Sequence, residues 1–125
     1  MTLQETHSPS PTFEAITAEA LVHVDIDTLP FGVVEMDGDG RVIRYSRFES
    51  ELSGLEVARV MGRHFFSEVG PCMNNFMVAQ KLEGADELDE IVDYVLTLRI
   101  APTAVRLRLL RTAEPRRRYL LVHRS

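Results

Sequence analysis

Apolar and polar residues alternate along the C-terminal third of the chain. Val105, Leu107 and Leu109 are separated by Arg106 and Arg108, which is the period of a β-strand with one buried face and one solvated face. The same reasoning predicts strands over residues 91–100, 103–111 and 118–123. Alternation of this kind is typical of an antiparallel sheet with helices packed on one side.

A second group of strand residues lies nearer the N-terminus. Residues 31–36 and 41–45 are rich in β-branched side chains, and the turn 37–40 between them contains two Asp-Gly pairs. Asp-Gly accepts positive φ at low cost, so this pattern predicts a β-hairpin. An EF-hand calcium loop would need a longer series of oxygen ligands ending in a glutamate. We therefore expect no metal at this turn.

The remaining apolar positions indicate short helices. Helical spacing predicts an amphipathic helix over residues 13–22, and further turns of helix are expected in 45–61 and 75–84. Residues 1–12 are rich in serine and proline and have the composition of a loosely attached leader.

Taken together, these elements predict an α+β fold with a five-stranded antiparallel sheet flanked by short helices and an N-terminal helical cap. We divide the chain into an N-terminal leader and cap, residues 1–28, and one domain, residues 29–125.

Length and composition narrow the class of protein. The chain has 125 residues and a mass of 14.2 kDa, enough for one domain with a core of ordinary size. No apolar run approaches the roughly 18 residues that a membrane span requires, and no signal-peptide pattern precedes the domain. We therefore expect a cytoplasmic protein that does not bind membranes.

Charge is distributed unevenly. The net charge of −5 argues against a dedicated nucleic-acid binder. Residues 1–98 hold 18 of the 19 acidic residues, whereas residues 99–125 hold eight of the 14 basic ones. Acidic and basic strands lying side by side in a sheet would neutralise each other. The alternative is a basic docking face around Arg116, Arg117 and Arg118.

Cys72 is the only cysteine of the chain. Gly70 and Pro71 fix the backbone before it, and Asn74 and Asn75 after it are residues that cap helices. A thiolate near a helix N-terminus is favoured by the dipole and becomes a possible covalent attachment point. The alternative is that Cys72 is a small buried hydrophobic residue.

A second candidate group is Tyr45, Glu49 and Ser53, which are spaced by four residues. On a helical segment this spacing places a phenol, a carboxyl group and a hydroxyl on one side. The alternative is that Glu49 is a solvated acid and Ser53 is a helix cap. The four histidines show no metal-ligand spacing, and His64 is the one close to Cys72 in the sequence. With no third group to orient such a base, we do not expect an enzyme.

With these residues in place, the chain resembles the photoactive yellow protein family, blue-light photoreceptors with the PAS fold, over roughly residues 24–125. A tyrosine, a glutamate four residues later and a Pro-Cys pair in register with them make the resemblance specific. The matching residues are the Leu-X-Phe-Gly pattern at 29–32, the turn at 37–40, Tyr45, Glu49, Ser53-Gly54, the run 60–66, Val69-Gly70-Pro71-Cys72 and Pro102-Thr103.

The resemblance implies a cofactor and its ligands. Cys72 would carry p-coumaric acid (4-hydroxycinnamic acid) as a thioester, Tyr45 and Glu49 would donate hydrogen bonds to its phenolate, and Ser53 would support Tyr45. A buried phenolate is tolerable only when charge-assisted hydrogen bonds spread its charge. Glu49 can donate such a bond only while it is protonated, which burial and an adjacent anion both favour.

The resemblance also implies a signalling mechanism. Photoisomerisation would move the Glu49 proton to the phenolate and leave an uncompensated buried carboxylate, which would loosen the domain. The N-terminal segment up to about residue 28 would then be released towards a downstream signalling protein of unknown identity. We expect a monomer or a weak homodimer. The alternative is a PAS-fold interaction or ligand-sensing module without the chromophore.

Three positions depart from the family pattern. Leu55 stands where the family usually has an arginine that gates the pocket, and Leu98 and Ile100 replace an aromatic residue and a methionine that line the chromophore side. We expect these changes to alter solvent shielding and recovery speed more than binding. The segment between Cys72 and Ile91 is also shorter than usual and lacks the family's proline.

Overall fold

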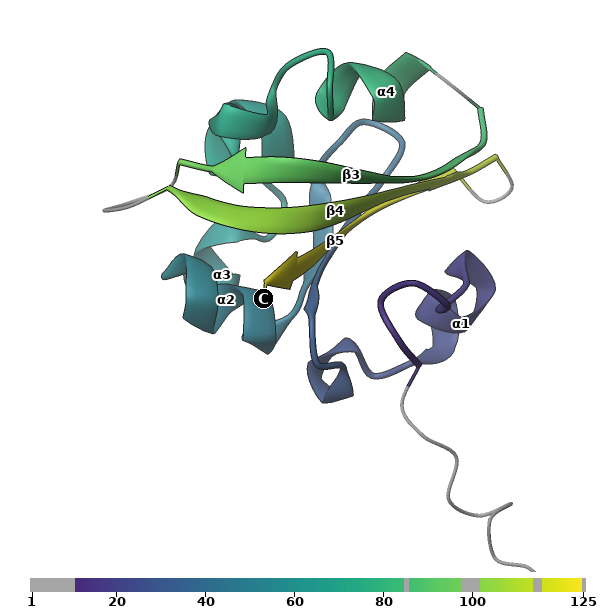
Figure 1. The fold of residues 1–125 in the computed structure, drawn as a ribbon, viewed down its shortest axis with the longest axis horizontal. Helices are drawn as coiled ribbons and strands as arrows, with labels where there is room; N and C mark the ends of the chain where they lie inside the picture. Colours follow the sequence, from purple (N-terminus) through teal and green to yellow (C-terminus); the bar gives the residue numbers. More distant parts are fainter. Residues whose placement is uncertain (1–10, 85, 98–101, 114–115, 125) are drawn as a thin grey trace, which may run out of the picture.

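Five antiparallel strands form one sheet in the order β2-β1-β5-β4-β3 (Figure 1). The computed structural model describes residues 11–84, 86–97, 102–113 and 116–124. The predicted α+β class, the five-stranded sheet and the N-terminal hairpin are confirmed. The strands are β1 (Gly32–Met36), β2 (Val42–Tyr45), β3 (Leu88–Leu96), β4 (Thr103–Thr112) and β5 (Arg117–Arg124).

Several strand limits differ from the predicted ones, most of them by one residue. β3 begins at Leu88 rather than at residue 91, because its first residues already pair with Arg111 and its neighbours in β4. β5 begins at Arg117, opposite Thr112. The predicted end of β3, residues 98–100, lies outside the described residues.

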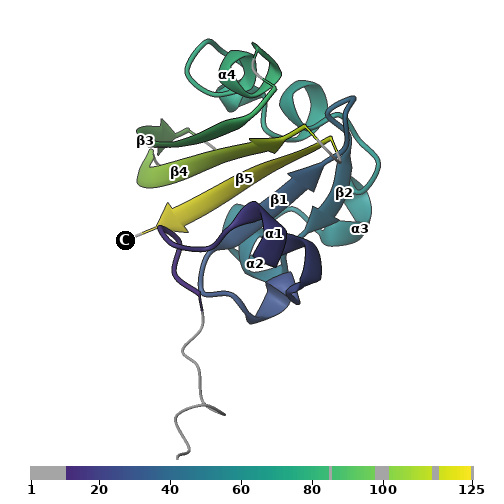
Figure 2. The same cartoon turned by 90° about the vertical axis from the view of Figure 1, so that its right-hand side faces the viewer.

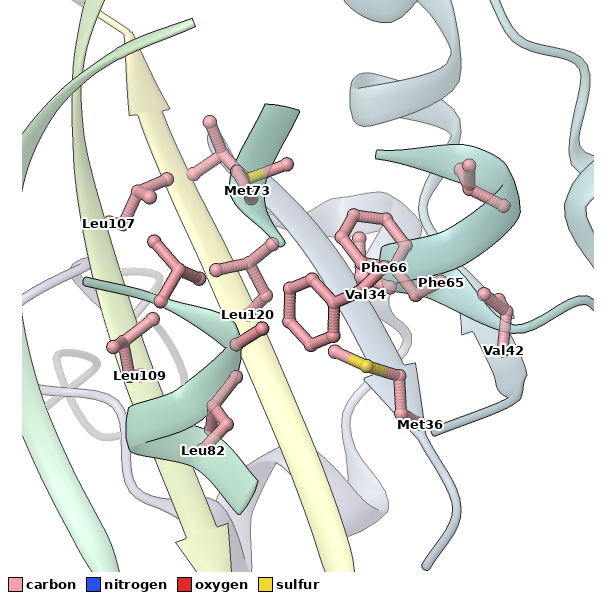
Figure 3. Packing of buried hydrophobic residues seen from close by; sticks show 14 of the residues in the cluster. Val34, Met36, Val42, Phe65, Phe66, Met73, Leu82, Leu107, Leu109 and Leu120 are labelled. Atoms are coloured by element: carbon pink, nitrogen blue, oxygen red, sulfur yellow. The ribbon is translucent and has the colours of Figure 1, made fainter. Parts of the chain in front are cut away.

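One face of the sheet carries the larger apolar cluster. Val34 of β1, Leu107 of β4 and Leu120 of β5 belong to it, together with Phe66 and Met73 from the segments that cover this face (Figure 3). The covering segments are α2 (Arg47–Ser53), α3 (Val57–Val60), the π-helical turn η3 (Phe65–Val69), the 3-10 turn η4 (Pro71–Met73) and α4 (Ala79–Gly84).

The opposite face is covered by the N-terminal segment, as both views of the fold show (Figures 1 and 2). Phe13, Ile16 and Leu21 pack with Tyr119 and Leu121 of β5 in a second buried cluster. Adjacent residues of β5 therefore point to different clusters, as the period of a strand requires. The segment contains α1 (Ala18–His23) and the 3-10 turn η2 (Ile26–Thr28).

The helix α1 begins later than predicted because its start is capped. Thr17 accepts a hydrogen bond from the Ala20 amide at 3.0 Å, so α1 begins at Ala18 and residues 13–15 form a turn. Among the described residues, no helix is long and apolar enough to cross a membrane.

Opposite charges pair across the sheet, which confirms local neutralisation. Arg108 of β4 binds Asp89 of β3 at 2.9 Å, and Arg117 binds Glu35 of β1 at 3.0 Å. Arg118 lies within β5 and is only 7% exposed. Arg118 is therefore not part of an exposed basic face, whereas the Arg117 side chain is paired with Glu35 but remains 38% exposed.

Candidate functional site

The end of β2 and the helix α2 bring together Tyr45, Glu49 and Ser53, the three residues that are spaced by four. Tyr45 ends β2, and Ser46 caps the helix by accepting a hydrogen bond from the Glu49 amide at 3.2 Å. Ser46 also accepts from the Val33 amide of β1 at 3.0 Å, which ties the start of α2 to the sheet. Tyr45, Glu49 and Ser53 are all buried. The interpretation of Glu49 as a solvated acid is therefore wrong.

Tyr45 and Ser53 are joined by a hydrogen bond of 2.9 Å between their hydroxyl oxygens. Burial raises the pKa of Tyr45 to about 12, and the nearby Glu49 carboxylate adds to this effect while Ser53 opposes it. Tyr45 therefore keeps its proton at neutral pH. A phenol has one hydrogen to donate, so when Ser53 donates to the Tyr45 oxygen, the Tyr45 hydrogen is available to a ligand.

Glu49 makes an ion pair that the sequence did not predict. Both of its carboxylate oxygens accept hydrogen bonds from Arg124 of β5, at 2.7 and 3.2 Å. The exposed fractions of the two side chains are 6% for Glu49 and 14% for Arg124. In this structure Glu49 is thus an acceptor held by a cation, and not a free proton donor.

Gly32 of β1 makes room for the Glu49 side chain. A Cβ atom at position 32 would lie 2.1 Å from Glu49 Oε1 and 3.1 Å from the Cδ atom of the same side chain. The carboxyl group of Glu49 therefore occupies space that only a glycine leaves open. This contact gives a physical reason for the glycine in the Leu-X-Phe-Gly pattern.

Cys72 lies in the three-residue 3-10 turn η4, with Pro71 as its first residue. The Tyr94 hydroxyl donates to the Cys72 carbonyl oxygen at 2.6 Å, and the Asn75 side-chain amide donates to the same oxygen at 3.3 Å. These bonds fix the backbone that carries the sulfur. Gly70 precedes the turn, and a Cβ there would meet the Phe65 ring at 2.9 Å.

The surroundings of Cys72 differ from the prediction in one respect. The helix expected from residue 75 begins only at Ala79, so the dipole of a full helix does not act on the sulfur. Asn75 still caps the following turn, since its side-chain oxygen accepts from the Met77 amide at 2.9 Å. Cys72 is partly buried and packs against the cluster that contains Tyr45. Its partial burial agrees with packing as a small hydrophobic residue and does not test covalent attachment.

The residues that depart from the family pattern are only partly described. Leu55 is partly buried, packs against the cluster that contains Tyr45, and donates its backbone N–H to Ser53 Oγ at 3.2 Å. Leu98 and Ile100 lie outside the described residues. His64, the histidine close to Cys72 in the sequence, contacts Ser67 Oγ at 2.8 Å through Nδ1.

Two of these groups, Tyr45 and Cys72, suit an anionic aromatic ligand attached to sulfur, whereas Glu49 already accepts two hydrogen bonds from Arg124. Tyr45 is a neutral donor in a buried place, Cys72 is a free thiol, and the Gly32 contact shows a carboxyl group fitted closely against β1. Within the described residues, no three His, Cys, Asp or Glu side chains come together as metal ligands.

Three contributors to the site were missed from the sequence: Gly32, Tyr94 and Arg124. The strand period offered a signal for Arg124, because Leu120 and Val122 predict that position 124 faces the same side of β5. Tyr94 has no comparable signal, since only the folded chain brings its hydroxyl to the Cys72 carbonyl group.

Comparisons with known proteins give consistent results. No protein-family model matches the chain. A relative from Rhodothalassium salexigens, named photoactive yellow protein, is 30% identical over 89 residues, which cover 69% of this chain and 71% of the relative. The photoactive yellow protein domain of the sensor histidine kinase Ppr from Rhodospirillum centenum superposes with a TM-score of 0.75 at 36% identity, covering 80% of this chain and 90% of that domain.

A more distant structure agrees in fold. The PAS domain of an HTR-like protein from Haloarcula marismortui has a TM-score of 0.63 at 15% identity and covers 98% of this chain and 100% of that domain. At this identity the likeness concerns the PAS fold alone.

Proposed function

This chain belongs to the photoactive yellow protein family, and on that premise we propose that it is a blue-light photoreceptor carrying p-coumaric acid as a thioester on Cys72. The observation that best supports this proposal is the buried hydrogen bond between Tyr45 and Ser53 beside Glu49. A neutral phenol, a hydroxyl that supports it and a carboxyl group are the set that a buried phenolate needs.

Each residue has a separate role in this proposal. When bound, the p-coumaroyl group supplies light absorption, photoisomerisation and a phenolate oxygen. Cys72 provides the sulfur, held in place by the bonds from Tyr94 and Asn75 to its carbonyl oxygen. Tyr45 donates its hydrogen, and Ser53 orients that hydrogen by donating to the Tyr45 oxygen. In the pigment, Glu49 would hold the proton that moves during the light response, whereas in the chromophore-free structure it accepts from Arg124.

The N-terminal segment is the element proposed to carry the signal. Residues 1–28 form the leader and cap in this proposal, and residues 29–125 form the photosensory domain. The ring centroids of Phe13 and His123 lie 5.3 Å apart, and Glu14 pairs with Arg106 at the surface. Release would also require breaking the hydrogen bonds from Arg108 to the Phe13 and Ile16 carbonyl oxygens, so we propose that the light response supplies the free energy for it. The released surface would bind a downstream signalling protein.

One observation favours the alternative, a PAS-fold sensing or interaction module without this chromophore. Arg124 already satisfies both oxygens of Glu49, so the buried carboxylate has its charge balanced by a residue of the chain itself. A site of this kind is stable without a ligand. The two functions differ in whether Cys72 becomes acylated.

The test is covalent attachment measured by intact mass. We expect the protein, incubated with an activated ester of p-coumaric acid, to gain the mass of one p-coumaroyl group. Cys72→Ala should gain nothing, because it removes the only sulfur that can form the thioester. Tyr45→Phe serves as the matched control, since it keeps the thiol and should still gain the mass. An unmodified wild-type protein, under conditions that label free thiols, would contradict the proposal.

A further inference from the structure

Arg124 occupies a place in the site that the family resemblance did not assign to it. It lies near the end of β5, two residues after Val122, which belongs to the same buried cluster as Tyr45. From there its guanidinium group reaches α2 and binds both oxygens of Glu49. The contact joins residues that are 75 positions apart in the sequence.

This pair is not an ordinary surface salt bridge. Both side chains are largely removed from water, so solvent and salt screen their attraction poorly. A carboxylate that accepts two parallel hydrogen bonds from arginine is in its ionised form. Removing one member of such a pair leaves a buried charge without a partner, which is far more costly than losing an exposed pair.

The charge of Arg124 also reaches the phenol of the site. Among the groups that act on Tyr45, Glu49 raises its pKa and Arg124 lowers it. Tyr45, Glu49 and Arg124 therefore share one electrostatic environment. The proton that Glu49 is proposed to hold belongs to this same group of charges.

We propose that Arg124 is the counter-cation of Glu49. This inference rests on the proposed function. In the chromophore-free protein, Arg124 holds Glu49 as a carboxylate. In the pigment, it stabilises the state in which the O–H bond of Glu49 has broken and the proton has passed to the phenolate oxygen. The net charge of the site is unchanged by that transfer, but the negative charge now lies directly against the guanidinium group.

The consequence reverses one expectation drawn from the sequence. The carboxylate left on Glu49 after proton transfer would not be uncompensated, because Arg124 lies 2.7 Å from it. Arg124 therefore prolongs the state reached in the light.

The first experiment uses the chromophore-free protein and so does not depend on the proposed function. Urea unfolding is measured for Arg124→Gln, Glu49→Gln and the double variant. We expect R124Q to lower the unfolding midpoint, because it leaves the Glu49 carboxylate buried and unpaired. The double variant, which also carries E49Q, should recover much of that loss. Arg117→Gln is the matched control. It breaks another ion pair of β5, with Glu35, and E49Q should not rescue it.

The second experiment uses the reconstituted pigment. We expect R124Q to return to its dark spectrum about tenfold faster than wild type, which corresponds to about 1.4 kcal/mol, while R117Q returns at the wild-type rate. The fraction of blue-absorbing pigment in the dark should also rise in R124Q.

The outcomes separate the two proposals. Additive effects of R124Q and E49Q on the midpoint would overturn the pairing. An unchanged return rate in R124Q would overturn its role in the pigment. Failure of the wild-type protein to take up the chromophore would overturn the proposed function and the role in the pigment, while the unfolding cycle would still decide whether Arg124 is the counter-cation of Glu49.

Discussion

Burial gives single residues of the site properties that they lack in water. Tyr45 is a phenol whose only described side-chain hydrogen bond is to Ser53, and its pKa rises to about 12 because the ionised form would lie in an apolar cluster. Burial also raises the pKa of Tyr119, on the opposite face of the sheet, to about 12. Both phenols therefore act as neutral groups at physiological pH.

The raised pKa of Tyr45 predicts a pH dependence of stability. In the unfolded chain a tyrosine titrates near 10, so the folded state holds this proton more tightly. The contribution of Tyr45 to stability is present in full below about pH 10 and is lost as the pH rises through 12. We expect the free energy of unfolding of Tyr45→Phe to fall less steeply than that of wild type over this range.

Urea unfolding of the chromophore-free protein at a series of pH values measures this difference. The pKa of Tyr45 is about two units higher in the folded state, so its contribution to the free energy of unfolding is about 3 kcal/mol, which is lost at the alkaline end of the range. Tyr119 is present in both proteins and cancels from the comparison. Equal slopes for the two proteins between pH 10 and 12 would show that Tyr45 titrates normally.

At the scale of elements, β4 holds the N-terminal cap through one buried arginine. The Arg108 guanidinium group donates to the carbonyl oxygens of Phe13 and Ile16 in the cap and to the Asp89 carboxylate of β3. Arg108 is 6% exposed. Hydrogen bonds from a charged group contribute about 1.5–3 kcal/mol each, so this side chain is a large part of what attaches the cap.

Arg108→Gln should therefore loosen the cap while the sheet stays folded. We expect amide hydrogens in residues 11–24 to lose about tenfold or more in exchange protection, a factor that corresponds to about 1.4 kcal/mol. Hydrogen exchange followed by mass spectrometry resolves the cap from peptides of the sheet.

Arg111→Gln is the control for this experiment, because Arg111 lies on the same strand but donates to the Leu82 carbonyl oxygen of α4, away from the cap. Wild-type exchange of the cap in R108Q would contradict the account, and so would equal loosening in R111Q.

The elements also show what the sequence could and could not predict. Strands were found because alternation at a period of two is visible locally, as in Val105 to Leu109 of β4. Helix starts were placed too early, because Thr17 and Asn75 delay the first helical turn through side-chain bonds to nearby amides. Such competition between turn and helix is decided by local hydrogen bonds that periodicity does not report.

At the scale of the whole molecule, β5 contacts both covered faces of the sheet. His123 packs on Phe13 of the cap, whereas its neighbour Arg124 reaches Glu49 on the opposite face. The alternation of side chains along a strand makes this division unavoidable. A displacement of the end of β5 would therefore move side chains at the site and at the cap together.

The site was predicted as far as its residues are near in sequence. The four-residue spacing of Tyr45, Glu49 and Ser53 predicted that they lie on one side but left open whether Glu49 is solvated, and the structure buries all three. The pairing of Glu49 with Arg124 could not be predicted in this way, because the two residues are 75 positions apart. They meet only because the sheet order places β5 beside β1, and so beside α2. The position of Leu98 and Ile100 relative to Tyr45 lies outside the described residues.

The central claim is that this chain turns light into a change at Glu49 and the cap, and the most direct test is a light–dark absorption cycle. The account predicts that protein carrying one p-coumaroyl group has a blue absorption band in the dark, loses it under blue light and regains it in darkness. Cys72→Ala, treated in the same way, should show neither band nor cycle. A protein with the confirmed mass of the thioester and a spectrum that blue light leaves unchanged would contradict the account.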